Sequence, residues 1–254
     1  MRMRPFLSLL MLVLLSASIT LASMPDEVAS ANQSLAAGRL PEALSAYQTL
    51  LALPDFSKFS SPELWFNLGL AEEKNHDLAA ASLSYRRALL LDPTLLLARS
   101  HLTTALTSLG IPESVTHTDQ LVAFVHPDFL ILGGALLGWA GVFAFLLLIM
   151  VGPSRPGWLA LALTALILGH GVTLFGTWID PRRLGSEEGV IIATRAPTLR
   201  ETPADSSKAE GTLAPGSLVT ILSRNGAWWK VSSSVSTGWL PATAVTPLLP
   251  TAGS

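Results

Sequence analysis

The sequence predicts a multidomain membrane protein built from α-helical hairpins, a two-helix transmembrane hairpin and a small all-β barrel. Half of its 254 residues are hydrophobic and 13% are charged, which is about half the charged share of an ordinary soluble chain. Two long uncharged apolar stretches follow a helical segment. After them, short β-branched and aromatic runs alternate with turn residues. These patterns set the order of the parts.

Charge and cysteine content exclude several classes of function. The formal net charge is −2, so the chain lacks the clustered Lys and Arg with which proteins neutralise nucleic-acid phosphates. Cysteine is absent, which removes disulfides, thiolate metal ligands, thiol nucleophiles and a lipid-modified cysteine anchor. We therefore expect no nucleic-acid partner and no cofactor.

Residues 1–22 have the order of a secretory signal peptide. Arg2 and Arg4 precede an apolar run from Phe6 to Leu15, and small residues then allow cleavage after Ala22. The apolar run is shorter than the roughly 20 residues that cross a bilayer, although a retained anchor is the alternative. In both cases the basic end stays inside and the following segment is exported.

A helical repeat domain is expected over residues 24–110. Within it, the segment from Pro62 to Leu95 carries small residues that let two helices approach and larger ones that fill the space around them: Trp65, Leu68, Gly69, Ala81, Tyr85, Ala88 and Pro93. This spacing resembles a tetratricopeptide repeat over its whole period. Pro93 ends the second helix because it has no backbone N–H to donate.

The repeat has incomplete neighbours on both sides. A weaker copy precedes it at Gly38, Ala43, Tyr47 and Pro54, and one further helix is expected from Leu97 to Leu109. About three units usually bury a continuous core. We therefore expect the last helix, or a partner, to complete the array.

The resemblance implies a peptide- or protein-binding groove on the concave face formed by the first helix of each repeat. By position in the motif, the residues facing it are Glu63, Phe66, Leu70, Glu73 and Lys74. The alternative is that these are ordinary solvated or packing positions. The segment from Met24 to Asp128 holds twelve acidic and six basic residues, which would steer a basic partner toward it.

Residues 111–128 are expected to be a juxtamembrane linker. It contains two His-x-Asp pairs, His117 with Asp119 and His126 with Asp128, which could supply nitrogen and oxygen ligands to a divalent metal. The spacing matches no established metal site, and juxtamembrane loops are often polar. We assign no metal site and no catalytic residue, because no nucleophile and base or paired carboxylates converge elsewhere.

Residues 129–151 and 158–179 are uncharged and long enough for two transmembrane helices. The loop 152–157 is so short that the helices must form an antiparallel hairpin. Export of the repeats places this loop in the cytoplasm and both flanking domains outside. Arg182 and Arg183 outnumber Arg155 of the loop, which opposes the positive-inside rule; the signal sequence carries more weight.

Two features of the spans concern helix packing. Gly134 and Gly138 form a small-xxx-small pair that packs the hairpin or, alternatively, mediates dimerisation. Folding the hairpin about its loop places His170 level with Gly138 and Trp139. Because no intramembrane carboxylate accompanies it, we expect His170 to be neutral and structural.

Residues 187–250 predict a small all-β domain. Runs at 189–193, 216–222, 227–231 and 237–241 are β-branched or aromatic and are separated by Gly, Pro, Asn and Ser. Asn225-Gly226 predicts a tight hairpin turn. The pattern around Leu199-Arg200, Pro215-Gly216 and 226–231 resembles a bacterial SH3 domain, although Ala196-Pro-Thr-Leu199 departs from its usual first motif.

Alternation along the strand sends Trp229 and Val231 to one face and Trp228 and Lys230 to the other. One tryptophan is therefore expected in the core and the other at the surface. In SH3-like domains exposed aromatic side chains form ligand grooves, so Trp228 and Trp239 are candidates for contact with a peptide or a wall fragment. Structural packing is the alternative.

The whole order of parts resembles the BatE proteins of bacterial aerotolerance (Bat) operons. The resemblance implies a non-enzymatic scaffold at the bacterial inner membrane, with both soluble domains in the periplasm. It also implies envelope partners, among them Bat membrane proteins with von Willebrand factor A domains and, indirectly, a MoxR-type ATPase, in stress or oxygen tolerance. The alternatives are a sensor that binds peptidoglycan or peptide through the barrel, and a cryptic enzyme or transporter.

Overall fold

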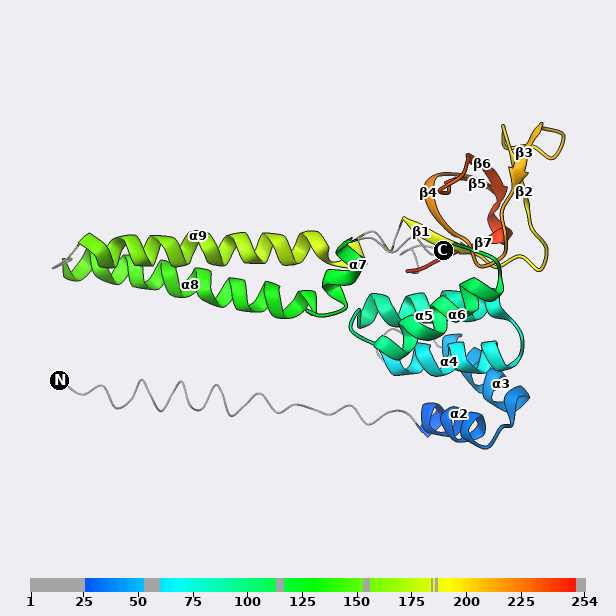
Figure 1. Ribbon diagram of the computed structural model, residues 1–254, viewed down its shortest axis with the longest axis horizontal. Helices are drawn as coiled ribbons and strands as arrows, with labels where there is room; N and C mark the ends of the chain where they lie inside the picture. Colours follow the sequence, from blue (N-terminus) through cyan, green and yellow to red (C-terminus); the bar gives the residue numbers. More distant parts are fainter. Residues whose placement is uncertain are drawn as a thin grey trace.

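The computed structural model describes residues 26–52, 60–112, 117–152, 156–183, 185 and 187–249. Figure 1 shows a helical domain and a β domain side by side at one end and a long two-helix hairpin extending away from them. The predicted fold class is confirmed. The expected signal peptide, Pro54 and Arg155 lie outside the described residues.

The helical domain consists of two helical hairpins and one further helix. Its helices are α2 (Asp26–Ala36), α3 (Leu40–Leu51), α4 (Pro62–Lys74), α5 (Leu78–Leu91) and α6 (Leu96–Ser108). The N-termini of α4 and α5 are capped, because Ser61 Oγ accepts a hydrogen bond from Leu64 N (3.1 Å) and Asp77 Oδ1 accepts one from Ala80 N (3.1 Å). Each cap fixes the first turn of its helix.

The α4–α5 hairpin is packed around Tyr85. A Cβ atom added to Gly69 would lie 2.6 Å from the Tyr85 ring, so glycine is required for this close approach. Ala81, Tyr85 and Ala88 are fully buried. The small residues of the repeat pattern thus set the distance between the helices, and the tyrosine fills the space that remains.

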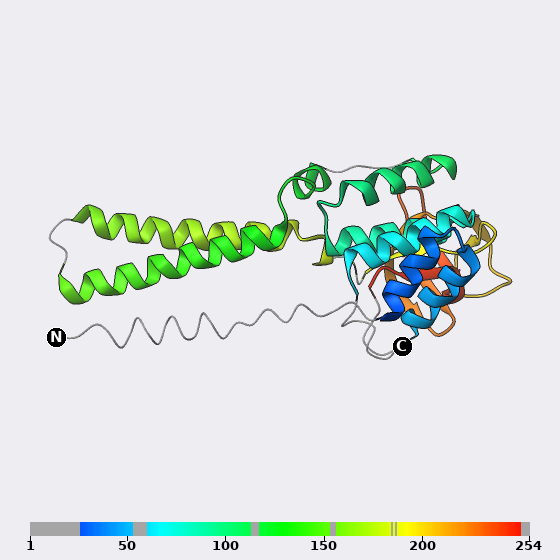
Figure 2. The ribbon, with the colours of Figure 1, turned by 90° about the horizontal axis from the view of Figure 1, so that it is seen from below.

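The stretch 111–128, expected as a linker, contains the short helix α7 (His117–Val122). It leads into α8 (Pro127–Val151), and α9 (Pro156–Ile179) returns beside it (Figure 2). Both helices are long and apolar enough to cross a membrane.

A row of glycines forms the contact between α8 and α9. Cβ atoms added to Gly134, Gly138 and Gly141 would each meet α9 at 2.5–2.8 Å, and one added to Gly169 would lie 2.2 Å from the Gly138 nitrogen. The small-xxx-small pair is therefore used within the hairpin. His170 lies opposite Gly138, as the folding of the hairpin predicts. Its Nδ1 donates to Leu166 O (2.9 Å), one turn earlier in α9, so the side chain takes part in the structure of its own helix.

The open end of the hairpin is closed by ionic contacts. Arg182, in the 3₁₀ turn η2 (Pro181–Arg183), is hydrogen-bonded to Asp128 at the start of α8 and to Asp180 (Nε to Oδ1, 2.9 Å) at the end of α9. Arg182 thus has a structural role where α8 begins and α9 ends.

The β domain is one antiparallel sheet of seven strands in the order β3-β2-β6-β5-β4-β1-β7. The strands are β1 (Glu188–Ile191), β2 (Thr198–Arg200), β3 (Ala209–Thr212), β4 (Leu218–Asn225), β5 (Trp228–Ser232), β6 (Thr237–Pro241) and β7 (Val245–Pro247). The sheet curls around buried aliphatic side chains that include Ile191, Leu199, Val231 and Leu240. The domain therefore has a core of its own.

The β4–β5 turn differs from the expected Asn225-Gly226 turn by one residue. Asn225 pairs with Trp228 as the last residue of β4, so the two central residues of the turn are Gly226 and Ala227. Gly226 has φ = 57°, the positive value that the first central position of a type II′ turn requires. The prediction was wrong because Asn225 is used in the strand pairing.

The two soluble domains share a small core that we call the junction. Leu83 and Leu90 of α5 pack with Val190 of β1 and Leu248 beyond β7, and all four are buried. Arg87 of α5 donates from Nε to Leu248 O (3.0 Å) and from Nη2 to Pro247 O (2.9 Å). The β domain therefore covers the second helix of the repeat, which completes the short array from within the chain.

Candidate functional site

The five groove residues predicted on α4 fall into two groups. Glu63 and Lys74 are exposed, whereas Phe66, Leu70 and Glu73 are half-buried. The β domain docks on α5 and so leaves these α4 positions uncovered by it. The surface of α4 that the repeat pattern predicts for a partner is thus partly free and partly used inside the domain.

Phe66 and Glu73 bind the three helices α4, α5 and α6 together. The Phe66 ring lies 5.9 Å from the ring of Tyr85 and 5.6 Å from that of His101. Glu73 accepts hydrogen bonds from the Tyr85 hydroxyl and from His101 Nδ1 (2.9 Å). Burial raises the pKa of Tyr85, so its hydroxyl remains a donor. These contacts give Phe66 and Glu73 a packing role.

The structure adds a polar row that the sequence analysis missed. Asn67 Nδ2 donates to Asn32 Oδ1 (3.1 Å), which also accepts from the Tyr47 hydroxyl (2.6 Å). His101 follows Asn67 by one 34-residue period. Asn32, Asn67 and His101 thus come from α2, α4 and α6, the first helices of successive units. Extending the period beyond the best repeat would have found His101.

Strand register places the two candidate tryptophans on the outer face of the β domain. Trp239 of β6 is directly opposite Lys230 of β5 and Arg200 of β2, and Trp228 is opposite Pro241. Directly paired residues share a face of a sheet. Arg200, Trp239 and Lys230 therefore form a row across three adjacent strands, with two cations flanking an aromatic ring.

The opposite face of the same strands is the core side. Trp229 is paired with Leu240, which is fully buried, and Val231 is paired with Gly238. The Arg224 guanidinium lies over the Trp229 ring, 4.8 Å from its centre. The strand register thus places Trp228 and Trp229 on opposite faces of the sheet, as the alternation predicts.

The two juxtamembrane His-x-Asp pairs do not assemble into a described cluster. His126 caps α8 by accepting from Asp128 N (3.2 Å), and Asp128 is paired with Arg182. The side chains of His117 and Asp119 lie outside the described part. Among the described residues, no group of three or more His, Asp or Glu side chains could hold a metal ion.

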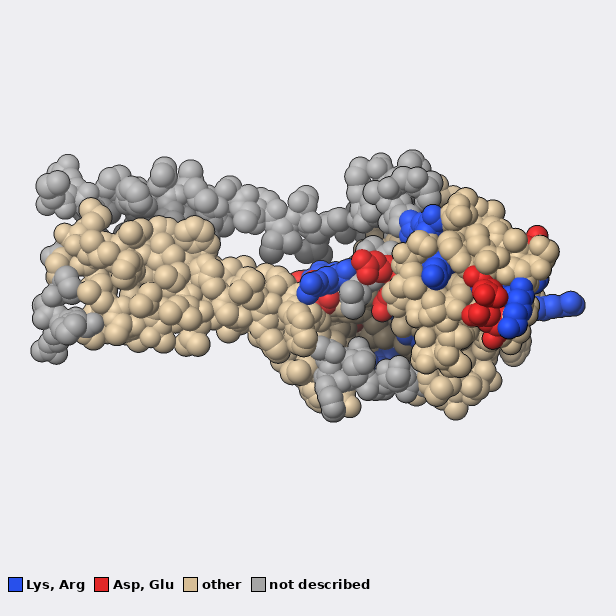
Figure 3. Space-filling model, turned by 90° about the horizontal axis from the view of Figure 1, so that it is seen from above, with Lys and Arg blue, Asp and Glu red and all other residues tan. Residues whose placement is uncertain are grey.

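Charged side chains are distributed unevenly over the molecule. On the face seen in Figure 3, the described hairpin surface carries no Lys, Arg, Asp or Glu beyond its base, and charges of both signs lie over the two soluble domains. This distribution fits an apolar surface on the hairpin and a water-facing surface on the domains.

Two parts of the chain match known families. Residues 62–95 match the tetratricopeptide repeat and residues 195–246 match the bacterial SH3 domain. No curated protein and no solved structure matches the chain. Both matched families are typically non-catalytic interaction domains. They suggest binding of proteins or of the cell wall, and the SH3 domain suggests an envelope location.

Proposed function

We propose that this protein is a membrane-anchored periplasmic scaffold that brings envelope proteins together. The observation that carries the proposal is the junction: Leu83, Leu90, Val190 and Leu248 form one core, and Arg87 bridges it. Two interaction modules joined in this way move as one body. A fixed spacing between two binding surfaces is what a scaffold needs.

The groove for the principal partner is on the first-helix face of the repeats. Glu63, Leu70 and Lys74 supply its exposed and half-buried positions, and Asn67 supplies a polar one. The Asn67 amide oxygen makes no hydrogen bond within the described residues, so it is available to accept one from the backbone of an extended partner. Phe66 and Glu73 support this surface from beneath.

The proposed partners follow from the resemblance to BatE proteins. They are Bat membrane proteins with von Willebrand factor A domains and, through them, a MoxR-type ATPase, in envelope stress or oxygen tolerance. In this proposal the inner membrane holds the hairpin, and the short loop 152–157 faces the cytoplasm. Signals from the cytoplasm would therefore reach this protein through its membrane partners.

A charge-swap experiment tests the groove while the fold is kept intact. Deleting the β domain would expose Leu83 and Leu90 to water, and deleting the helical domain would expose Val190 and Leu248, so point substitutions are preferable. The variant Glu63→Lys with Lys74→Glu preserves net charge and should abolish co-purification of the von Willebrand factor A proteins from detergent extracts. The control, Arg39→Glu with Glu42→Lys, also swaps two exposed charges, at the start of α3, and should retain the partners.

Equal recovery of these partners by the groove variant and its control would contradict the groove assignment. Orientation is tested separately by fusing reporters after Gly185. A periplasm-dependent reporter should be active there, whereas activity of a cytoplasm-dependent reporter would overturn the proposed topology.

The second candidate function is a sensor of the cell wall or of a peptide, favoured by the row of Arg200, Trp239 and Lys230. An aromatic ring between two cations suits a ligand that has both an apolar face and a carboxylate. In the full-length protein, Trp239→Ala combined with Trp228→Ala should abolish binding to purified peptidoglycan. Retained binding with both rings removed would exclude this surface.

A further inference from the structure

Exposed apolar side chains gather where the helical domain meets the hairpin. They come from the start of α6 and from the segment between α7 and α8, and we call them the apolar collar: Leu96, Leu97, Leu121, Phe124, Val125 and Phe129. Phe124 is 87% exposed and Phe129 is 75% exposed. Contiguous apolar surface of this kind on a folded protein marks a contact with a partner or a membrane.

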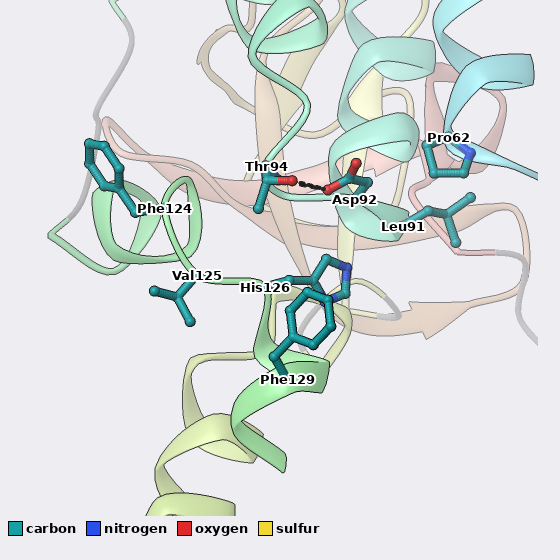
Figure 4. A pocket seen from close by; sticks show the side chains of 8 residues that line it. All are labelled: Pro62, Leu91, Asp92, Thr94, Phe124, Val125, His126 and Phe129. Atoms are coloured by element: carbon teal, nitrogen blue, oxygen red, sulfur yellow. Dashed lines mark hydrogen bonds between the residues drawn. The ribbon is translucent and has the colours of Figure 1, made fainter. Parts of the chain in front are cut away.

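The two halves of the collar are held next to one another. Thr94, which leads into α6, lines the same cavity of about 590 Å³ as Phe124, Val125 and Phe129 (Figure 4). Asp92 Oδ1 accepts hydrogen bonds from Thr94 N (2.9 Å) and Thr94 Oγ1 (2.6 Å). The turn before α6 is thereby fixed, and Leu96 and Leu97 directly follow it.

Some side chains of the segment between α7 and α8 are buried against the protein, and the others are exposed. Val122 and Pro127 are buried, whereas Leu121, Phe124 and Val125 between or beside them are exposed. This division anchors the segment and presents its apolar side chains outward. A short amphipathic segment of this kind suits the interface of a bilayer.

The apolar surface of the hairpin continues into the collar. Pro127 begins α8 two residues after Val125, and the exposed positions of α8 beyond Phe129 are also apolar. Among the charged groups at this level, Asp128 and Asp180 both pair with Arg182, and Arg183 is exposed. Paired charges and an exposed arginine beside exposed aromatic and aliphatic side chains are the composition of a membrane–water boundary.

We infer that the apolar collar rests in the headgroup and upper acyl layer of the bilayer, so that its partner is the lipid surface itself. The inference rests on the membrane span proposed above. Contact at both α6 and the α7–α8 segment attaches the helical domain to the membrane at two places. The domain then cannot swing about the hairpin, and the α4 groove stays at a constant height above the lipid.

Spin labels on the full-length protein in phosphatidylcholine–phosphatidylglycerol vesicles test this contact. The chain has no cysteine, so single substitutions carry one label each: Phe124→Cys and Leu97→Cys in the collar, Leu147→Cys within α8, and Val235→Cys as control. Val235 is also an apolar residue with 87% exposure, but it lies between β5 and β6 of the β domain. Matched exposure makes Val235 the reference for an apolar side chain in water.

Collision with oxygen, which concentrates in lipid, is compared with collision with a water-soluble nickel chelate. Labels at positions 124, 97 and 147 should favour oxygen, and the label at 235 should favour nickel. For the two collar positions the ratio of oxygen to nickel accessibility should exceed that at position 235 at least several-fold. Their depth should be about 5–10 Å, as for interfacial segments.

The other outcomes separate the inference from the proposal on which it rests. If position 147 favours oxygen while position 124 or 97 behaves like 235, the collar does not lie in lipid and the inference is overturned. If position 124 is shielded from both reagents, protein rather than lipid covers it, which also overturns the inference. If position 147 favours nickel, the membrane span itself is wrong.

Discussion

The hairpin and the junction are both contacts between elements of one chain, but they are built from opposite kinds of residue. In the hairpin, Gly134, Gly138 and Gly169 bring the α8 and α9 backbones together. In the junction, Leu90 and Leu248 fill the space between α5 and the β domain with large side chains. The hairpin interface depends on close approach of two backbones, and the junction depends on large side chains that fill the space between the domains.

With the hairpin in the proposed membrane span, the difference follows from the solvent of each interface. In water, burial of an aliphatic side chain is favourable by about 25 cal/mol per Å² of apolar area, so large residues are the effective choice at the junction. In lipid the surroundings are as apolar as leucine, and helices associate through van der Waals contact at short distance. Four predictions use this contrast, starting with the largest expected effect.

Gly169→Leu should separate α8 from α9, because even a Cβ atom there would lie 2.2 Å from the Gly138 nitrogen. Spin labels on cysteines that replace the exposed residues Leu132 of α8 and Leu174 of α9 report on the separation. We expect the distance between the two labels to increase in the variant. Gly171→Leu is the matched control, because a Cβ on Gly171 meets nothing within 4 Å; an equal increase there would refute the role of the glycine row.

Leu90→Ala should reduce the free energy of unfolding of the soluble part by about 3 kcal/mol, the cost of a cavity in a packed core. Guanidinium titration of the purified protein in detergent, followed by tryptophan fluorescence, measures it. Leu222→Ala is the comparison, because Leu222 is exposed on β4, and it should cost less than about 0.5 kcal/mol. Similar losses for both would mean that the junction contributes no more than surface contacts.

The free energy of unfolding of the helical domain should fall as the pH rises, because of Glu72 on α4. Burial raises the pKa of Glu72 from its usual 4.5 to about 7, so the folded chain keeps a proton that the unfolded chain releases between these values. The stabilisation from protonated Glu72 is complete below pH ~4.5 and is lost as the pH rises through about 7. The loss is on the order of 3 kcal/mol, at about 1.4 kcal/mol per pKa unit.

Glu72→Gln should remove this pH dependence, because the amide can keep the contact with Ser84, whose Oγ lies 2.6 Å from Glu72 Oε2. Denaturant titrations at pH 5 and pH 8 compare the variant with the parent chain. If the unfolding free energy of the variant fell between pH 5 and pH 8 as much as that of the parent chain, a different group would be responsible.

Arg87→Met should cost about 2 kcal/mol, because it leaves two carbonyl oxygens beyond and within β7 without their charged donor. It also removes the guanidinium that lies 4.6 Å from the centre of the Trp65 ring. The change in unfolding free energy should be accompanied by altered Trp65 fluorescence. Arg39→Met, at an exposed position, should leave both measurements unchanged.

Much of the fold could be predicted because local patterns decide it. The spacing from Trp65 to Pro93 specifies a helical hairpin through the distances between small and large residues, and the apolar length of the spans specifies their helices. Strand alternation likewise separated Trp228 from Trp229. In each case residues a few positions apart carry the information.

The candidate site was only partly predictable, because several groove positions gain their role from other helices. Phe66 and Glu73 stand at groove positions by spacing, yet Tyr85 and His101 draw them into packing. The turn at Gly226 shifted by one residue because pairing of Asn225 with Trp228 took precedence over the local turn preference. Both outcomes depend on neighbours that a local pattern does not contain.

The sequence by itself determined the helices of the repeat domain, the two long apolar helices and the strands β1, β4, β5 and β6, and in what order they follow. Only the tertiary structure decided that the β domain completes the repeats through Arg87 and Leu248, which are 161 positions apart in the chain. The physical reason is that periodicity records which face of an element is apolar, whereas the element that covers this face is chosen by shape and by the few polar groups left to satisfy.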